Sequence, residues 1–325
     1  MKIAVTAALL TWVLAQVDWP EFRRTLALTN VWLLLLVVML RFGSMSLSAL
    51  KWQQLLAVHG VRYAFNQLQG WYFISFFLSQ FLPSLIGGDA YRIYKTYRNE
   101  KARVISVLAV LADRVTGLIV LLLVGYAAAI YVYVDTGEEL AQALVWMGSI
   151  FFALLPVAVW VLFSRHRERF TASRFCVKPL RSLIEHADDY RLVAAHGRMA
   201  LVWAASFAFH GIRVFTTWLI LYAVGVFSDP AQVAVAVVAV TVAGMLPISI
   251  GGLGLMEGSF VYVMARYGVS PEAGLITMLL SRATLLPMFA AAGVYFMLER
   301  KQRPAAGRPL GAPLANEPIT RNESV

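Results

Sequence analysis

Long apolar segments constrain the fold of this chain more than any other feature of its sequence. A helix that crosses the hydrocarbon core of a bilayer needs about 20 predominantly apolar residues, and its backbone groups must find their hydrogen bonds within the segment. The alternating pattern of a transmembrane β-barrel is absent. We therefore predict an all-α, polytopic helical membrane protein. Its apolar segments cover residues 3–17, 31–50, 68–86, 104–134, 141–163, 199–227, 231–250, 255–265 and 274–298.

The shorter segments limit the number of crossings. Residues 255–265 are too few to cross the bilayer as a simple helix. We therefore expect about six to eight transmembrane helices, with the shorter pieces as re-entrant segments. The first segment follows Lys2 but lacks a clean small-x-small cleavage site, so an uncleaved helix is expected rather than a removed signal peptide.

The composition excludes several other classes of protein. Apolar residues make up 60% of the chain and charged residues only 14%, whereas soluble domains carry about a quarter charged residues. The net charge of +10 is explained by loops that face anionic lipid headgroups, so nucleic-acid binding is not expected. Cys176 is the only cysteine, which excludes an intrachain disulfide and a cysteine-rich metal site. We expect no metal and no cofactor.

The loop charges predict an orientation. Basic residues gather in 92–103, 164–198 and 300–303, whereas the connectors 135–140 and 228–230 contain acids and no lysine or arginine. Because cytoplasmic loops carry the excess of lysine and arginine, the basic segments are expected inside and the acidic connectors outside. The C-terminus is then cytoplasmic.

The domain organisation is predicted to be simple. Residues 1–299 form a single transmembrane domain, and residues 300–325, rich in proline, alanine and glycine, form a disordered cytoplasmic tail. The basic cytoplasmic loop 164–198 is either an amphipathic helix at the membrane interface or a solvated linker. No polar stretch is longer than about 35 residues, and no HExxH, GxSxG or Walker pattern is present. We therefore do not expect an enzyme.

The string Leu-Pro-x-x-Ile-Gly-Gly occurs twice, at residues 82–88 and 246–252, and each copy precedes an acid, Asp89 or Glu257. Proline lacks a backbone donor and glycine adopts conformations that other residues avoid, so each copy is predicted to break a helix. Matching breaks in two halves of a membrane protein point to a binding site and leave open an internal repeat. The alternative is that the glycines only allow helices to cross closely. The predicted helix-break residues are Pro83, Gly87, Gly88, Pro247, Gly251, Gly252 and Gly254.

Charged residues inside apolar segments are the candidates for a substrate-binding site, because each costs at least a few kcal/mol to insert. Half-helices that begin at the breaks would direct free N–H groups towards an anion, and the Arg92 fork suits phosphate oxygens. Either Arg213 or Arg282 could pair with Glu257 and leave the other for substrate. The candidates are Asp89, Arg92, Asp113, Arg114, Arg213, Glu257 and Arg282.

Some of these charges have a simpler explanation. Asp113 and Arg114 point about 100° apart on a helix, so each needs an outside partner, and Arg114 could instead extend to the lipid headgroups. His210 lies three residues before Arg213, and we interpret it as a core histidine rather than a proton relay. Arg41 has no partner that the sequence identifies.

The ordered motifs resemble the lysylphosphatidylglycerol synthase transmembrane, or flippase-like, family over nearly the whole chain to about Glu299. The matching positions are Pro83, Gly87, Gly88, Asp89 and Arg92, then Asp113 and Arg114, then Pro247, Ser249, Gly251, Gly252, Gly254 and Glu257. The resemblance implies an integral protein of a bacterial or archaeal cytoplasmic membrane that handles polar-headed lipids. The sequence contains no aminoacyl-tRNA-dependent transferase domain, so an aminoacyl transferase activity is not expected.

The leading hypothesis is therefore a flippase or lipid-handling transporter for a polar- or phosphate-headed lipid, with membrane lipids as its partners. Arg92, Arg213 and Arg282 would meet the phosphate, while Asp89 and Glu257 would hold the arginines or act as gates. The alternative is an accessory subunit that moves no lipid and binds a separately encoded lipid- or glycan-modifying enzyme. A membrane-embedded transferase with a carboxylate base ranks last.

Overall fold

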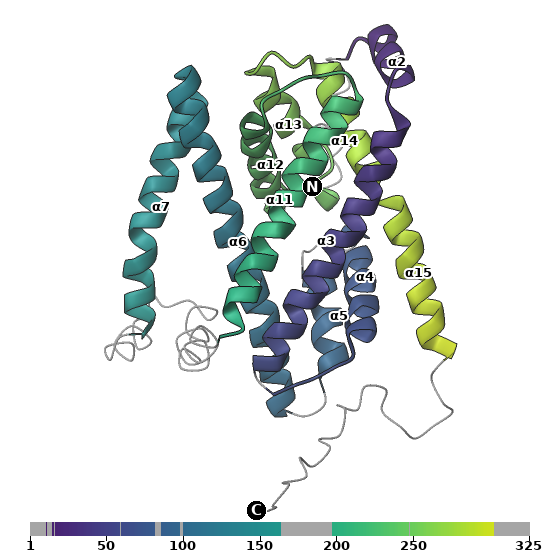
Figure 1. Ribbon diagram of the computed structural model, residues 1–325, viewed down its shortest axis with the longest axis vertical. Coiled ribbons are helices and arrows are strands. Elements are labelled where there is room, and N and C mark those ends of the chain that lie inside the picture. Colours follow the sequence, from purple (N-terminus) through teal and green to yellow (C-terminus); the bar gives the residue numbers. More distant parts are fainter. Residues whose placement is uncertain are drawn as a thin grey trace, which may run out of the picture.

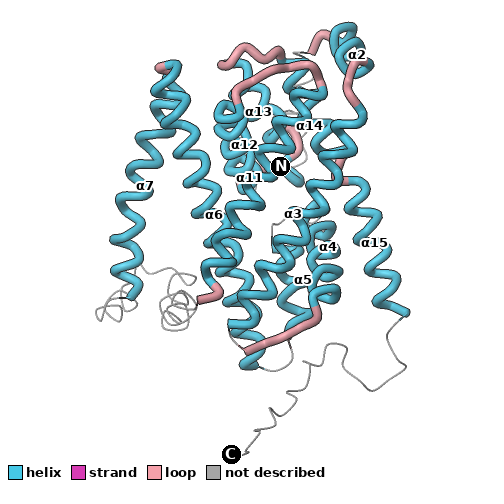
Figure 2. The backbone as a smooth tube through the Cα atoms, in the orientation of Figure 1, coloured by secondary structure: helices cyan, strands magenta, loops and turns pink. Residues whose placement is uncertain are grey.

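The computed structural model describes residues 11, 15, 17–58, 60–81, 86–97, 100–163, 197–246 and 248–301. Within these ranges every regular element is a helix, which agrees with the predicted all-α fold (Figure 1, Figure 2). Pro83 and Pro247 lie outside the described residues, as do most of the loop 164–198 and of the tail 300–325.

The helices divide into long spans and shorter pieces. They are α2 (Trp19–Ala27), α3 (Val31–Val58), α4 (Phe65–Phe81), α5 (Ile86–Thr96), α6 (Glu100–Thr136), α7 (Glu139–Phe163), α11 (Met199–Ala223), α12 (Pro230–Met245), the 3₁₀ turn η1 (Ile250–Gly252), α13 (Leu255–Ala265), α14 (Pro271–Ala283) and α15 (Leu286–Lys301). Five stretches are long and apolar enough to cross a membrane: Val31–Val58, Val104–Thr136, Glu139–Val157, Met199–Ala223 and Pro271–Leu298. The chain is a polytopic helical membrane protein.

The last span is kinked, although the sequence predicts one continuous segment over residues 274–298. α14 ends at Ala283, and α15 begins at Leu286 after a two-residue turn. Pro287 explains the kink, because proline lacks an N–H donor and its ring clashes with the carbonyl group four residues earlier. The break leaves backbone carbonyls of α14 in need of other donors.

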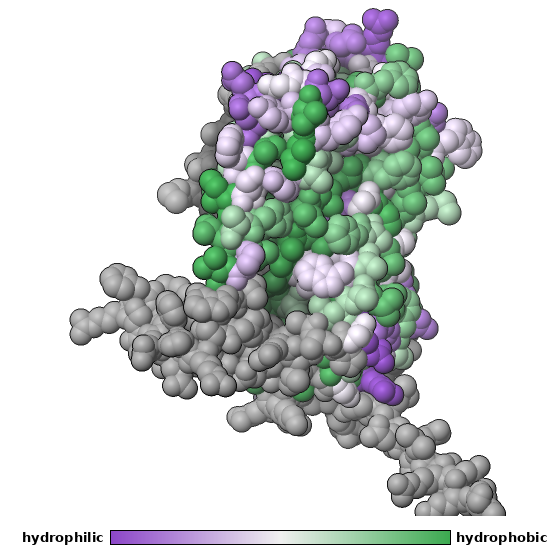
Figure 3. All heavy atoms as spheres, turned by 60° about the vertical axis from the view of Figure 1, so that its left-hand side comes forward, coloured by the Kyte–Doolittle hydropathy of each residue, from purple (hydrophilic) through white to green (hydrophobic). Residues whose placement is uncertain are grey.

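Acidic connectors and basic segments lie at opposite ends of the bundle, as the loop charges predict. The α6–α7 and α11–α12 connectors lie at the upper end in Figure 1, whereas the α5–α6 junction and the end of α15 lie at the lower end. Figure 3 shows hydrophilic side chains at the upper end and a hydrophobic band beneath them. Arg92 is an exception to the predicted basic loop, because it is buried within α5.

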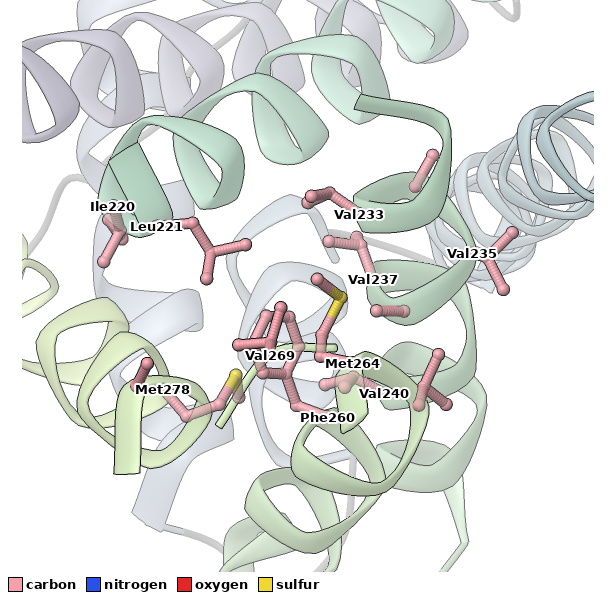
Figure 4. Close-up of a cluster of buried hydrophobic side chains, with 14 of the residues drawn as sticks. Ile220, Leu221, Val233, Val235, Val237, Val240, Phe260, Met264, Val269 and Met278 are labelled. Atoms are coloured by element: carbon pink, nitrogen blue, oxygen red, sulfur yellow. The ribbon is translucent and has the colours of Figure 1, made fainter. Parts of the chain in front are cut away.

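The largest apolar core lies among α6, α11, α12, α13 and α14. Val233, Val237, Phe260 and Met264 are among its buried members (Figure 4). α12 consists mainly of valine and alanine and packs against both α6 and α13. A helix that is apolar on all sides is typical of the centre of a membrane bundle.

Two helical hairpins enter the bundle from opposite ends. α4 and α5 pack against each other in the lower half of Figure 1, and α12 and α13 pack against each other in the upper half. The chain reverses direction between the two arms of each hairpin, after Phe81 in the first and after Met245 in the second. The turn η1 of the second hairpin contacts α4 of the first. The turning region of the second hairpin therefore lies against an arm of the first inside the molecule.

Candidate functional site

The second copy of the repeated string forms a helix break that depends on glycine. Between the end of α12 and the start of α13, Gly251, Gly252 and Gly254 have φ values of 59°, 72° and 78°. Side chains with a Cβ rarely adopt this left-handed region. These glycines therefore allow the chain to turn and begin α13 within the core.

The first copy is built differently. Gly87 and Gly88 lie in the first turn of α5, so both are helical residues. Gly88 permits close packing: its carbonyl accepts a 2.8 Å hydrogen bond from Ser75 Oγ of α4. A Cβ on Gly88 would lie 2.3 Å from the Ser75 carbonyl oxygen and 2.0 Å from Ser79 Oγ. The close-crossing interpretation therefore describes Gly88, and the helix-break interpretation describes Gly251 and Gly252.

An ion-pair network, here called the first polar cluster, surrounds the start of α5. Its members are Lys51, Asp89, Arg92, Asp113 and Arg114. Asp113 accepts from Arg92 at 2.8 Å and from Lys51 at 3.0 Å. Asp89 accepts from Arg92 at 2.5 Å and from Arg114 Nε at 2.8 Å. The adjacent residues Asp113 and Arg114 each bind an outside partner, as their helical positions require.

Arg92 directs both terminal nitrogens of its guanidinium group to carboxylates, and its Nε is buried without a hydrogen-bond partner. Its side chain is 4% exposed and bridges the two carboxylates of the cluster. Its guanidinium carbon also lies 5.0 Å from the ring centre of Tyr72 and 5.4 Å from that of Trp52. Cation–π contacts and two charge-assisted bonds together hold a buried arginine firmly. Arg92 therefore holds the two carboxylates of the cluster in place, and its contact with a phosphate stays a prediction.

Glu257 forms the centre of a second site at the start of α13. Its Oε2 accepts a 2.8 Å bond from the Gly254 N–H, which is the reciprocal half of a capping box. Its Oε1 accepts a 2.5 Å bond from Arg282 Nε of α14. The Glu257 side chain is only 2% exposed. Arg282 therefore pairs with Glu257, and Arg213 is the arginine that stays outside this pair.

The two hairpins share one structural device. Asp89 of the first hairpin binds Arg114 Nε, and Glu257 of the second binds Arg282 Nε. In both cases the acid begins a half-helix and the arginine comes 25 residues later, on a following helix. The same spacing in both halves indicates related structural units that enter from opposite ends. The structure thus supports an internal repeat beyond the repeated string itself.

Arg41 and Arg213 form a third polar group, here called the arginine pair. Arg41 Nη1 donates to the Ser281 carbonyl and, at 2.7 Å, to Thr284 Oγ1, while Nη2 donates to Ser281 Oγ at 2.7 Å. Arg213 lies on α11, which packs closely against α3, and it is near enough to Arg41 for their charges to repel. Across the described part of the chain, neither arginine has an ion-pair partner.

His210 connects the arginine pair with the first polar cluster. It lies on α11, one turn before Arg213, and close enough to Lys51 and Asp113 for an electrostatic interaction with both. Its Nε2 is near Gly117 of α6, and its Nδ1 is buried without a hydrogen-bond partner. His210 therefore lies near both polar groups.

Several site residues were missed by sequence reasoning. Lys51 lies one residue beyond the apolar segment predicted over residues 31–50, whereas α3 continues to Val58. Trp52 and Tyr72 resemble ordinary core aromatics in the sequence, and only their contact with Arg92 distinguishes them. No group of three or more His, Cys, Asp or Glu side chains that could hold a metal ion occurs in the ranges that the structure describes.

The fold and these sites define a polytopic membrane protein with two opposed half-helical hairpins, each fixed by an acid–arginine pair. The family model for the lysylphosphatidylglycerol synthase TM region matches residues 1–293. The chain belongs to this family. Comparisons with curated proteins and with solved structures gave no significant match.

Proposed function

We propose that this chain is a lipid-handling transporter of the flippase type, which moves a polar-headed lipid between the leaflets of a bacterial or archaeal cytoplasmic membrane. The headgroup would enter the polar region between the two hairpins while the tails stay in the surrounding lipid. Membership of the family and the membrane-helical fold support a role in the membrane. The basic end of the bundle would face the cytoplasm.

The observation that carries this proposal is the meeting of the two hairpins. η1 contacts α4, so the turn of one hairpin lies against an arm of the hairpin that enters from the opposite end. Broken helices are tolerated at membrane depth only where protein buries them or a watery cavity bathes them. In transporters, such half-helices lie at the substrate site near the middle of the bilayer. A simple helical anchor has no need for buried charges that are costly to insert.

Reconstitution tests the proposal directly. The purified full-length protein would be placed in liposomes that contain a fluorescently labelled phospholipid, and dithionite would quench the label in the outer leaflet. We expect dithionite to quench more than half of the total label, because the protein would bring inner-leaflet label to the outer leaflet. This quenching should be faster than in protein-free liposomes. An accessory subunit would instead leave the inner-leaflet label protected, and that result would refute transport for the lipid tested.

A second assay in cells identifies the headgroup. Leaflet-resolved lipid mass spectrometry would compare a deletion strain with the same strain complemented by the wild-type gene. We expect one class of phosphate-bearing lipid to accumulate in the inner leaflet of the deletion strain. Unchanged leaflet distributions for every lipid class would argue for the accessory role.

A further inference from the structure

The arginine pair lies at the middle of the membrane-spanning part of the bundle. Arg41 is ten residues beyond Val31, the start of α3, and Arg213 is ten residues before Ala223, the end of α11. The Asn30 N–H donates to the Ala223 carbonyl at 2.9 Å, so these two helix ends lie at the same level. Ten helical residues span about 15 Å, which is half of the roughly 30 Å hydrocarbon core.

α14 brings neutral acceptors to the same depth. Ser281 follows Pro271, the first residue of α14, by ten residues and lies just before the kink. The Ser281 carbonyl accepts from Arg41 and from Thr284 Oγ1, so it no longer depends on an intrahelical donor. These contacts orient the Arg41 guanidinium without neutralising its charge.

The charge of this pair distinguishes it from the other two sites. In the first polar cluster, three cations face two carboxylates, and Arg282 faces Glu257. At the arginine pair, the Arg41 guanidinium binds neutral oxygens of α14, Arg213 lies near His210, and each arginine is only partly buried. Two uncompensated cations at mid-membrane depth are costly. An anion placed between them would offset that cost.

We propose that Arg41 and Arg213 form a binding site for the phosphate group of the transported lipid. This inference rests on the proposed function, which leaves the headgroup chemistry open. A phosphate offers several oxygens to two planar forks, and such charge-assisted bonds are stronger than neutral ones. A cationic or uncharged headgroup would leave the repulsion between the arginines uncompensated. His210 would lie at the edge of this site.

Equilibrium binding to the full-length protein in detergent tests the inference without requiring transport. The probes are dioctanoyl phosphatidate and dioctanoylglycerol, which share their tails and differ in the phosphate, and binding is measured by native mass spectrometry. We expect phosphatidate to bind more tightly than dioctanoylglycerol by at least about tenfold. Inorganic phosphate serves as competitor. If it displaces phosphatidate, the site also binds free phosphate; if it does not, the site binds only lipid phosphate.

Variants then locate the binding. Arg213→Gln is expected to weaken phosphatidate binding by about tenfold to a hundredfold, which is the range for a lost charge-assisted hydrogen bond. Arg213→Lys keeps the charge but loses the fork, so an intermediate loss is expected. The matched control is Arg24→Gln, because Arg24 of α2 has a side chain 76% exposed, away from the pair. Wild-type affinity in Arg213→Gln would overturn the inference.

Stability without lipid separates a ligand site from a structural role. Because Arg213 and Arg41 repel each other, the lipid-free Arg213→Gln variant should unfold at or above the wild-type Tm. Added phosphatidate should raise the Tm of this variant less than it raises the Tm of the wild type. A lower Tm without lipid would identify a structural role and overturn the site. Phosphatidate binding that depends on Arg213 in a protein that moves no lipid would refute transport and leave the site standing.

Discussion

Arginine side chains inside this bundle fall into two groups according to what neutralises them. Arg92, Arg114 and Arg282 bind carboxylates of their own protein. Arg41 binds only neutral oxygens and Arg213 lies beside it, and neither has an ion-pair partner among the described residues. Removing one partner of a buried ion pair leaves an uncompensated charge, which costs far more than the pair itself contributes. The two groups should therefore respond to mutation in opposite ways.

Asp113→Asn should destabilise the protein strongly. The substitution leaves Lys51 and Arg92 with an amide in place of a shared carboxylate, in a site where the Asp113 side chain is 10% exposed. We expect a loss of about 3 kcal/mol or more, measured by chemical unfolding in detergent. Glu21→Gln, at an exposed surface pair of 3.9 Å, is the control and should have almost no effect. Equal stability of the two variants would contradict the network.

Glu257 makes two interactions, one with the Gly254 N–H and one with Arg282, and a double-mutant cycle measures the second. Glu257→Gln keeps an acceptor for the Gly254 N–H but loses the charge that faces Arg282. We expect Glu257→Gln and Arg282→Gln each to destabilise the protein, with a coupling energy of about 1 kcal/mol or more. Unfolding of the two single variants and the double variant gives this energy. Strict additivity would mean that the two side chains act independently.

Among the helical elements, glycines act in different ways in the two hairpins. Gly88 allows α5 to lie against α4, whereas Gly251 and Gly252 provide the left-handed turn before α13. The two copies of one string thus give matching hairpins by unlike means. Both arrangements bring an acid to the start of a half-helix, where the helix dipole favours it.

Gly88→Ala tests the packing of the first hairpin. The added methyl group would meet the Ser75 backbone, which cannot rotate away as a flexible side chain does. We expect a destabilisation of about 1–3 kcal/mol from overpacking, together with slower lipid movement in liposomes. Gly293→Ala is the matched control, because a Cβ on this helical glycine of α15 meets nothing within 4 Å. Wild-type transport and stability in Gly88→Ala would show that the close crossing is dispensable.

At the scale of the whole molecule, the charge distribution predicts which end faces the cytoplasm. Cysteine labelling in intact cells can test this, starting from Cys176→Ser to remove the single native thiol. Thr136→Cys, at the acidic end, should react with a membrane-impermeant maleimide in intact cells. Gly197→Cys, at the basic end, should react only after the membrane is opened. Both positions are exposed, so the reverse pattern would invert the orientation.

Local sequence patterns predicted much of the fold. Apolar length predicted the long helices, and the loop charges predicted which connectors share an end of the bundle. The repeated string identified both places where the chain reverses. Helix boundaries shifted where a polar residue continued a helix, as at Lys51, and where Pro287 divided an apolar segment. These shifts depend on packing and backbone geometry that hydropathy alone does not contain.

The membrane class, the helical fold and the residue types available for a polar site follow from the sequence, because insertion costs and backbone hydrogen bonding act locally. Which charges pair depends on the packing of the helices in three dimensions. Whether Arg282 or Arg213 meets Glu257 depends on how α14 and α11 pack around α13, and the structure selects Arg282. A charge left unpaired is a property of the whole arrangement, so Arg41 and Arg213 stand out only once every neighbour is in place.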